Sequence, residues 1–101
     1  AHQIPSTVVY EDDKVIAFDD LAPQAPVHTL VIPKDHYANI IDGVPADVLA
    51  AMVNAVSEVA RAKGLDDGFR VIANTGEVAG QTVHHFHMHV LGGKPLGENL
   101  V

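Results

Sequence analysis

One long segment, Pro45–Lys63, has the residue spacing of an amphipathic helix. Apolar side chains that recur three and four positions apart lie on one face of a helix. Pro45 suits the first position of such a helix, and Gly64 suits the position directly after its end. The recurring apolar positions are Val48, Leu49, Met52, Val53, Val56, Val59 and Ala60. The rest of the chain must therefore supply the surface against which this single apolar face is buried.

The other apolar segments are short and rich in β-branched residues, which predicts strands. Two of them enclose Asp12-Asp13 and are predicted to form a hairpin, while Pro23 and Pro26 indicate a loop. A short helical turn is expected before Gly43. The five predicted strands are Thr7–Tyr10, Val15–Phe18, Val27–Pro33, Phe69–Asn74 and Val83–Leu91. Hairpins around one long helix predict an α+β fold with a five-stranded, mainly antiparallel sheet.

Length and composition limit the functions that are open to the chain. For 101 residues we expect a single domain, residues 1–101. The formal net charge of −7 argues against a nucleic-acid-binding surface, because such surfaces are usually basic. Cysteine is absent, which excludes disulfides and thiolate-ligated zinc. No apolar run approaches the ~20 residues of a membrane span, and no signal peptide is recognisable, so we expect a cytoplasmic protein without a membrane partner.

Four of the seven histidines lie within the six residues His84–His89. Three of them alternate with Phe86, Met88 and Val90. In a strand, residues two apart point to the same face, so the three histidines would share one face and the apolar residues would pack against the helix from the other. A polar, solvent-exposed strand face is the plain alternative. Three histidines in register favour a function instead; these are His85, His87 and His89.

Two kinds of site are compatible with such a histidine row. Imidazole is a common ligand of Zn²⁺, and a pair of histidines on a strand can bind the ion together with a third ligand. Neutral imidazole is also a nucleophile and proton carrier near pH 7. The preceding loop supplies neutral donors and glycines, which suit a phosphate better than a cation. Its candidate residues are Asn74, Gly76, Gly80, Gln81 and Thr82. We therefore favour phosphate chemistry and keep a metal site as the alternative.

The segment His85-Phe86-His87-Met88-His89-Val90-Leu91 resembles the signature of the histidine-triad (HIT) superfamily, His-φ-His-φ-His-φ-φ with φ apolar. The resemblance extends from Ile4 to about Gly97 and implies a HIT-like fold. Gly92-Gly93 resembles the branch of purine nucleoside phosphoramidases. Since the chain begins without methionine, we expect that the N-terminal segment of the family is truncated.

The resemblance implies a hydrolase that cleaves the α-phosphate bond of purine nucleoside phosphoramidates. His87 would be the nucleophile that forms a covalent nucleotidyl-histidine, and His89 would contact the phosphate. His85 and His28 would complete the network around the nucleophile, and Asp20 would bind the ribose hydroxyls. The remaining implied contacts to the nucleotide come from Asn74, Gly80, Gln81, Thr82, Ile4, Phe18, Leu21 and Leu30.

The resemblance also implies a homodimer, AMP or GMP conjugates as substrates, and a reaction without metal or other cofactor. Several features differ from the commoner family pattern, among them Asp19 and His84. Asp19 is expected to add negative charge near the phosphate, and His84 has no assigned role. A histidine-ligated metal protein or metallohydrolase, and a non-catalytic nucleotide-binding regulator, remain the alternatives.

Overall fold

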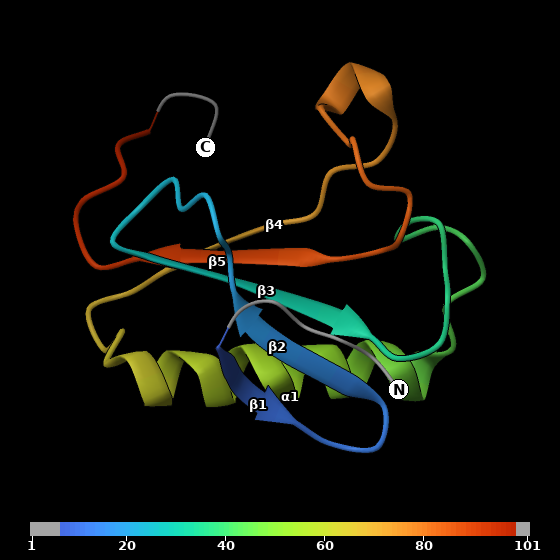
Figure 1. Cartoon of the computed structure of the whole chain (residues 1–101), viewed down its shortest axis with the longest axis horizontal. Coiled ribbons are helices and arrows are strands. Elements are labelled where there is room, and N and C mark those ends of the chain that lie inside the picture. The colour runs from blue at the N-terminus through green and yellow to red at the C-terminus, as the bar shows by residue number, and fades with distance from the viewer. Residues whose placement is uncertain (1–6, 99–101) are drawn as a thin grey trace.

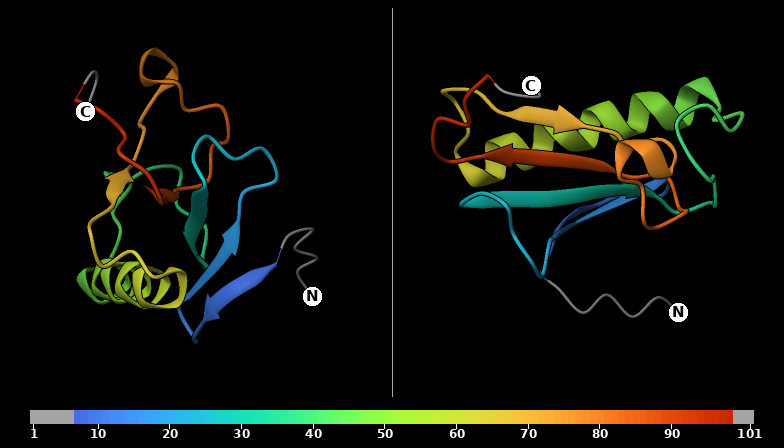
Figure 2. Two further views of the ribbon diagram at one scale, coloured as in Figure 1. Left: turned by 90° about the vertical axis from the view of Figure 1, so that its left-hand side faces the viewer. Right: turned by 90° about the horizontal axis from the view of Figure 1, so that it is seen from above.

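A five-stranded antiparallel sheet with one helix on one of its faces forms the fold (Figures 1 and 2). The computed structural model describes residues 7–98. The strands lie in the order β1-β2-β3-β5-β4, so the last strand in sequence is inserted between β3 and β4. The elements are β1 (Val8–Glu11), β2 (Val15–Asp19), β3 (Val27–Pro33), α1 (Ala46–Lys63), β4 (Arg70–Ile72), the 3-10 turn η1 (Glu77–Ala79) and β5 (Met88–Gly92). The predicted α+β, HIT-like architecture is confirmed.

Helix α1 occupies nearly the range that the apolar spacing predicts. Pro45 is extended and lies just before the first helical residue, and its carbonyl accepts hydrogen bonds from the first turn. Gly64 ends the helix in the left-handed conformation, with φ of 66°, which glycine adopts without strain. One part of the predicted stripe is wrong. Val53 is 62% exposed, and Ala55 is buried instead.

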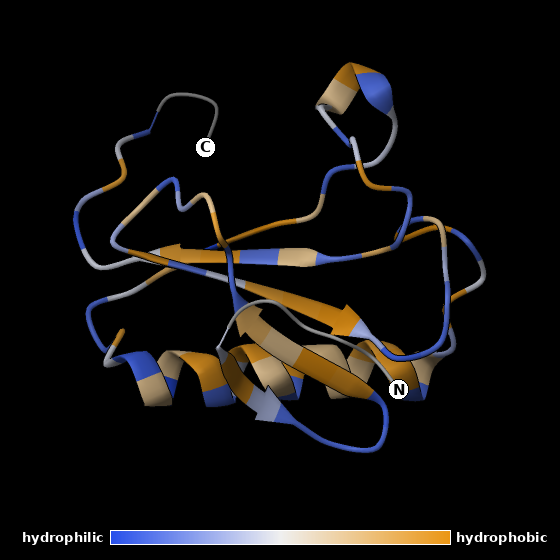
Figure 3. Ribbon diagram, viewed as in Figure 1, coloured by the Kyte–Doolittle hydropathy of each residue, from blue (hydrophilic) through white to orange (hydrophobic). Residues whose placement is uncertain are grey.

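The core lies between α1 and one face of the sheet. Strands contribute Val15, Ala17, Val31 and Val90, and the helix contributes a row that includes Met52, which is fully buried. In Figure 3 apolar residues dominate β2 and β3, whereas the turn between β1 and β2 is hydrophilic. Because side chains alternate along a strand, the intervening residues of β3 and β5 point to the opposite face.

Strand β5 begins at Met88, five residues later than predicted. Its first pairing is with Val31 of β3, and continuing this register would place Phe86 opposite Pro33. Proline has no N–H to donate to a neighbouring strand. The N–H of Phe86 donates instead to the carbonyl of Tyr37, at 2.6 Å. The segment that holds His84 to His87 therefore lies outside the sheet.

Smaller details of the secondary structure also differ from the prediction. Strand β4 covers only Arg70–Ile72, and the short helical turn falls at η1 rather than before Gly43. Residues 39–42 form a turn that is closed by the hydrogen bond from Asp42 N to Asn39 O. Between residues 7 and 98, no helix combines the length and the apolar character needed to cross a bilayer. The cytoplasmic location stays a prediction.

Candidate active site

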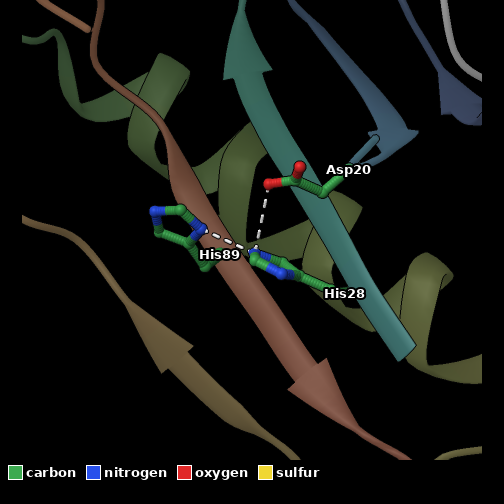
Figure 4. Close-up of side chains that lie close together, drawn as sticks. All are labelled: Asp20, His28 and His89. Atoms are coloured by element: carbon green, nitrogen blue, oxygen red, sulfur yellow. Dashed lines mark hydrogen bonds and ion pairs between the residues drawn. The ribbon is translucent and has the colours of Figure 1, made fainter. Parts of the chain in front are cut away.

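Two histidines from neighbouring strands meet on the sheet face that points away from α1. His28 lies on β3 and His89 on β5, and His28 Nε2 is 2.8 Å from His89 Nδ1. The carboxylate of Asp20, which directly follows β2, lies 3.4 Å from the same His28 nitrogen. Figure 4 shows the three side chains converging above the two strands. The antiparallel register of β3 and β5 brings together residues that are 61 positions apart in sequence.

The hydrogen bonds of His28 define where its proton lies. The backbone N–H of Gln24 donates to His28 Nδ1 at 2.9 Å, so this nitrogen is an acceptor. Neutral His28 must then carry its proton on Nε2, from which it donates to Nδ1 of His89. His89 in turn must carry its proton on its own Nε2. The ring of His89 therefore offers an N–H donor on the side away from His28.

His89 favours the neutral state for physical reasons. Burial of the ring lowers the pKa of His89 below its usual value of 6.5, because a charged imidazolium loses hydration there. The adjacent rings of His87 and His28 lower the pKa further, and the carboxylate of Asp20 acts in the opposite direction. A neutral His89 is consistent with a ring that accepts at Nδ1 and donates at Nε2.

His87 has the opposite arrangement of proton and lone pair. Its Nδ1 is 2.7 Å from the carbonyl oxygen of His85, which can only accept, so Nδ1 carries the proton. Nε2 of neutral His87 is then left with a free lone pair. The rings of His87 and His89 are neighbours, with centroids 4.9 Å apart and an angle of 72° between their planes. The site therefore places a nucleophilic nitrogen beside an N–H donor.

The side chain of His85 bonds away from these two rings. Its Nε2 is 3.0 Å from the carbonyl oxygen of Pro33, and its Nδ1 is 3.0 Å from Nδ1 of His36. What His85 provides to His87 is its main-chain carbonyl. The prediction that a strand aligns all three histidines on one face is thus wrong, because only His89 lies in β5. Sequence reasoning missed His36, since alternation within the histidine run carries no information on a residue 49 positions earlier.

The polar loop before the histidines is organised by Gln81. This side chain is buried, accepts from Gly76 N at 2.8 Å and donates to Ala38 O at 2.7 Å. Both ends of its amide are therefore engaged with the main chain. Within residues 7–98, no hydrogen bond engages the side chains of Asn74 or Thr82, so their polar groups remain available to a ligand. Thr82 and Gly80 are exposed, and Gly80 has a positive φ of 87°.

Part of the predicted apolar wall adjoins the histidines. Phe18 of β2 pairs with Leu30 of β3, which pairs with His89 of β5, so these three side chains form one row across the sheet. Phe18 and Leu30 are half-buried. Leu21 is 71% exposed in the loop after β2. Ile4 lies outside the described residues.

The two neighbouring acids, Asp19 and Asp20, are placed on different sides of the sheet. The hydroxyl of Thr29, a residue of the core-facing side, donates to Asp19 Oδ1 at 3.0 Å. The ammonium of Lys63, at the end of α1, lies 3.0 Å from Asp19 Oδ2. Asp19 is therefore paired on the helix side, which overturns the expectation that it adds charge beside the phosphate. Asp20 alone faces the histidines, with one oxygen accepting from Ala22 N.

The same side chains have the donor types of a metal site. One atom each of Asp20, His28 and His89 lie within 4.8 Å of one another. Two imidazole nitrogens and a carboxylate oxygen are a donor set that zinc accepts. Binding would displace the proton that His28 and His89 share in their 2.8 Å hydrogen bond. The donor set fits a zinc ion. The same geometry, without metal, fixes which nitrogen of His28 and of His89 carries the proton.

Comparison with known proteins identifies the family. Residues 1–96 match the HIT domain. The purine nucleoside phosphoramidase of Escherichia coli K12 is 45% identical over 102 residues, covering 97% of this chain and 85% of that protein. A 14 kDa zinc-binding protein of Brassica juncea is 44% identical over 103 residues, covering 93% of this chain and 87% of the relative.

A solved structure of similar shape supports the same assignment. A HIT family hydrolase from Clostridium thermocellum superposes with a TM-score of 0.89 at 46% identity, covering 97% of this chain and 88% of that one. The resemblance noted in the sequence is thereby confirmed. The chain belongs to the HIT family and is a hydrolytic enzyme of that family.

Proposed function

We propose that this enzyme hydrolyses purine nucleoside phosphoramidates at the α-phosphorus through a covalent intermediate on His87. The observation that carries the proposal is the opposite proton placement on His87 and His89, which puts a lone pair and a donor side by side. A phosphoryl group needs both, because one nitrogen attacks the phosphorus while the other binds a non-bridging oxygen. The name of the Escherichia coli relative supports the substrate class.

The first step makes a phosphorus–nitrogen bond to His87 and breaks the one to the leaving amine. Nε2 of His87 attacks in line, and the electron pair of the broken bond stays on the amine nitrogen, which takes up a proton. In this scheme the hydroxyl of Thr82 passes that proton and regains one from water. The His87 ring becomes positively charged, and its Nδ1–H bond to the His85 carbonyl strengthens because it is now charge-assisted.

The second step returns the enzyme to its starting state. Water attacks the phosphorus, the bond to His87 Nε2 breaks with its electron pair returning to that nitrogen, and the nucleoside monophosphate leaves. The proton that this water loses neutralises the hydroxide that remained when Thr82 regained its proton from water in the first step. The N–H of His89 stabilises the negative charge on the phosphoryl oxygens in both steps, an effect typically of about 3 kcal/mol for one such donor. In the same proposal Asp20 binds the ribose hydroxyls, and Phe18 and Leu30 contact the purine. No step is assigned to a metal.

Replacing the nucleophile should separate chemistry from folding. We expect His87→Ala to lower kcat/KM for an adenosine phosphoramidate by at least ~1,000-fold, because the covalent route is lost. The matched control is His84→Ala, an exposed histidine of the same segment, which should stay within about twofold of the wild type. Mass spectrometry of the quenched wild-type reaction should detect a nucleotidyl adduct on His87. Near-wild-type turnover by His87→Ala would refute its assignment as the nucleophile.

A substrate panel tests the proposed reaction class. Adenosine and guanosine phosphoramidates, nucleoside phosphosulfates and diadenosine polyphosphates are compared by kcat/KM. We expect the phosphoramidates to be the best substrates, because a protonated amine leaves readily from phosphorus. Preference for diadenosine polyphosphates would contradict the proposal. The absence of turnover with the whole panel would favour a nucleotide-binding regulator.

The role of His89 as a neutral donor predicts a pH dependence of stability. The folded protein lowers the pKa of His89 below 6.5, so the unfolded chain binds this proton first as the pH falls. The contribution of this group to the free energy of unfolding is therefore fully present above pH ~6.5 and is lost as the pH falls through the lower pKa of the folded state. NMR titration of the His89 ring, alongside urea unfolding at several pH values, checks this. A midpoint of 6.5 or higher would contradict it.

Zinc binding is the second candidate function. It is favoured by the proximity of Asp20, His28 and His89 and by the name of the Brassica juncea relative, a zinc-binding protein. Our main proposal predicts that turnover persists in chelator and that added zinc competes with the substrate, because both use His89. Metal analysis of the purified protein and activity in EDTA distinguish the two. Stoichiometric zinc together with chelator-sensitive turnover would favour a metallohydrolase.

We also propose that two copies associate through the edge of the sheet at β4. Strand β4 has a neighbour on one side only within the described residues, and Val71 on it is 42% exposed. An unpaired strand edge with apolar side chains is a ready surface for association. Phe69 beside the strand and Val53 on α1 are exposed as well. A symmetric pair of such edges would continue the sheet from one protomer into its partner.

A charge placed on this edge should dissociate the dimer. We expect Val71→Asp to be a monomer in sedimentation experiments at micromolar concentration, because a carboxylate would be buried without a partner. Ile41→Asp replaces an equally apolar, 80% exposed residue away from β4, and this control should remain dimeric. A wild-type protein that sediments as a monomer would exclude the proposed association.

A further inference from the structure

A second histidine contact lies beside the nucleophile and has no part in the steps described above. His36, three residues after the end of β3, places its Nδ1 3.0 Å from Nδ1 of His85. The two rings have centroids 4.9 Å apart and are tilted by 59°. His36 is exposed, while His85 is half-buried. A hydrogen bond between two such rings needs a proton on one nitrogen and a lone pair on the other.

The surroundings determine the direction of this hydrogen bond. His85 Nε2 lies 3.0 Å from the carbonyl oxygen of Pro33, and a carbonyl can only accept, so Nε2 carries the proton. Neutral His85 therefore has its lone pair on Nδ1. The donor must then be Nδ1–H of His36. With this donor in place, both ring nitrogens of His85 are hydrogen-bonded, Nε2 to the Pro33 carbonyl and Nδ1 to His36.

His85 matters because its main-chain carbonyl holds the proton of His87. This carbonyl accepts from His87 Nδ1 at 2.7 Å, which is the bond that leaves Nε2 of His87 free. The residues from His84 to His87 precede β5, so no strand ladder fixes the orientation of that peptide group. Other contacts must do so.

The segment His36–Ala38 supplies those contacts from three consecutive residues. The carbonyl of Ala38 accepts from Gln81 Nε2 at 2.7 Å, and the carbonyl of Tyr37 accepts from Phe86 N at 2.6 Å. The first bond holds the chain four residues before His85. The second is made by the N–H of the same peptide group to which the His85 carbonyl belongs, so it holds that group on its N–H side. The third, from His36, is made by a side chain of this segment and is the one of the three that contacts the His85 ring.

We propose that His36 is a positioning residue that orients His85 and thereby keeps His87 in its Nδ1–H form. The kinetic consequence rests on the proposed function, whereas the proton position on His87 does not. His36 touches no reacting atom in this scheme. Its loss would free the His85 ring and leave the bond to Tyr37 alone to orient the peptide group. A fraction of His87 would then carry its proton on Nε2, from which it cannot attack phosphorus. The effect should therefore fall on kcat and leave KM nearly unchanged.

Two isosteric variants separate the donor from the mere presence of a polar side chain. The amide nitrogen of asparagine is attached to Cγ, as Nδ1 of histidine is, so His36→Asn can keep the donor. In His36→Gln the amide lies one bond further out and cannot. His36→Ala removes the group, and His84→Ala is the matched control, an exposed histidine of the triad segment. Because His36 is exposed, all four variants should fold, which thermal unfolding checks.

The measurements are kcat and KM for an adenosine phosphoramidate, and the ¹⁵N chemical shifts of the His87 ring, which report its tautomer without substrate. We expect His36→Ala and His36→Gln to lower kcat roughly fivefold to tenfold, the effect of one ordinary hydrogen bond. The same two variants should shift His87 toward the Nε2–H form, and His36→Asn should restore the wild-type kcat and shifts. His84→Ala should match the wild type.

Three outcomes would overturn the inference: unchanged His87 shifts in His36→Ala, an equal loss in His36→Asn and His36→Gln, or a change in KM alone. If the wild type hydrolysed no phosphoramidate, the proposed function would fail. The ¹⁵N shifts of the variants would then still decide the role of His36.

Discussion

The pairing of β3 with β5 is the contact on which the site depends. It joins the central strand β3 to its neighbour β5, and its register brings His28 beside His89. The pairing also has a defined end. Beyond Val31 and Met88 the next inward-facing position of β3 is Pro33, which has no N–H. The histidine segment leaves the sheet there, so one ring of the triad is held by a strand and the other two by main-chain carbonyls.

Main-chain groups, more than other side chains, determine what each imidazole can do. An N–H from Gln24 makes His28 an acceptor at Nδ1, and the carbonyl of His85 makes His87 a donor at Nδ1. The partners on the main chain have fixed donor or acceptor roles, so each of them selects one tautomer of the neutral ring that it contacts. Two identical side chains in one loop and strand thereby acquire different chemistry. His87 exposes a lone pair and His89 exposes a proton.

Periodicity was sufficient to predict the helix, the number of strands and their mainly antiparallel arrangement. The signature residues identified the family, because spacing and residue type were both preserved over the whole segment. The start of β5 could not be predicted, since the alternation of histidine and apolar residues continues whether or not a neighbouring strand is present. Only the register shows that Phe86 would face Pro33. His36 was missed for the same reason, as its contact to His85 depends on the path of the chain after β3.

The division of Asp19 and Asp20 between the two faces of the sheet has an electrostatic consequence. A nucleotide phosphate approaches with negative charge, and a second carboxylate about 4 Å away would oppose it by roughly 4 kcal/mol near a protein surface. Asp19 does not oppose the phosphate in this way, because its side chain points to the other face of the sheet, toward Lys63 and Thr29. Its ion pair with Lys63 there links the end of α1 to the sheet. The sheet thus separates two carboxylates that are adjacent in sequence, and the ion pair with Lys63 offsets the charge of Asp19. A chain can carry a pair of acids at this point and still present a single negative charge to an anionic ligand.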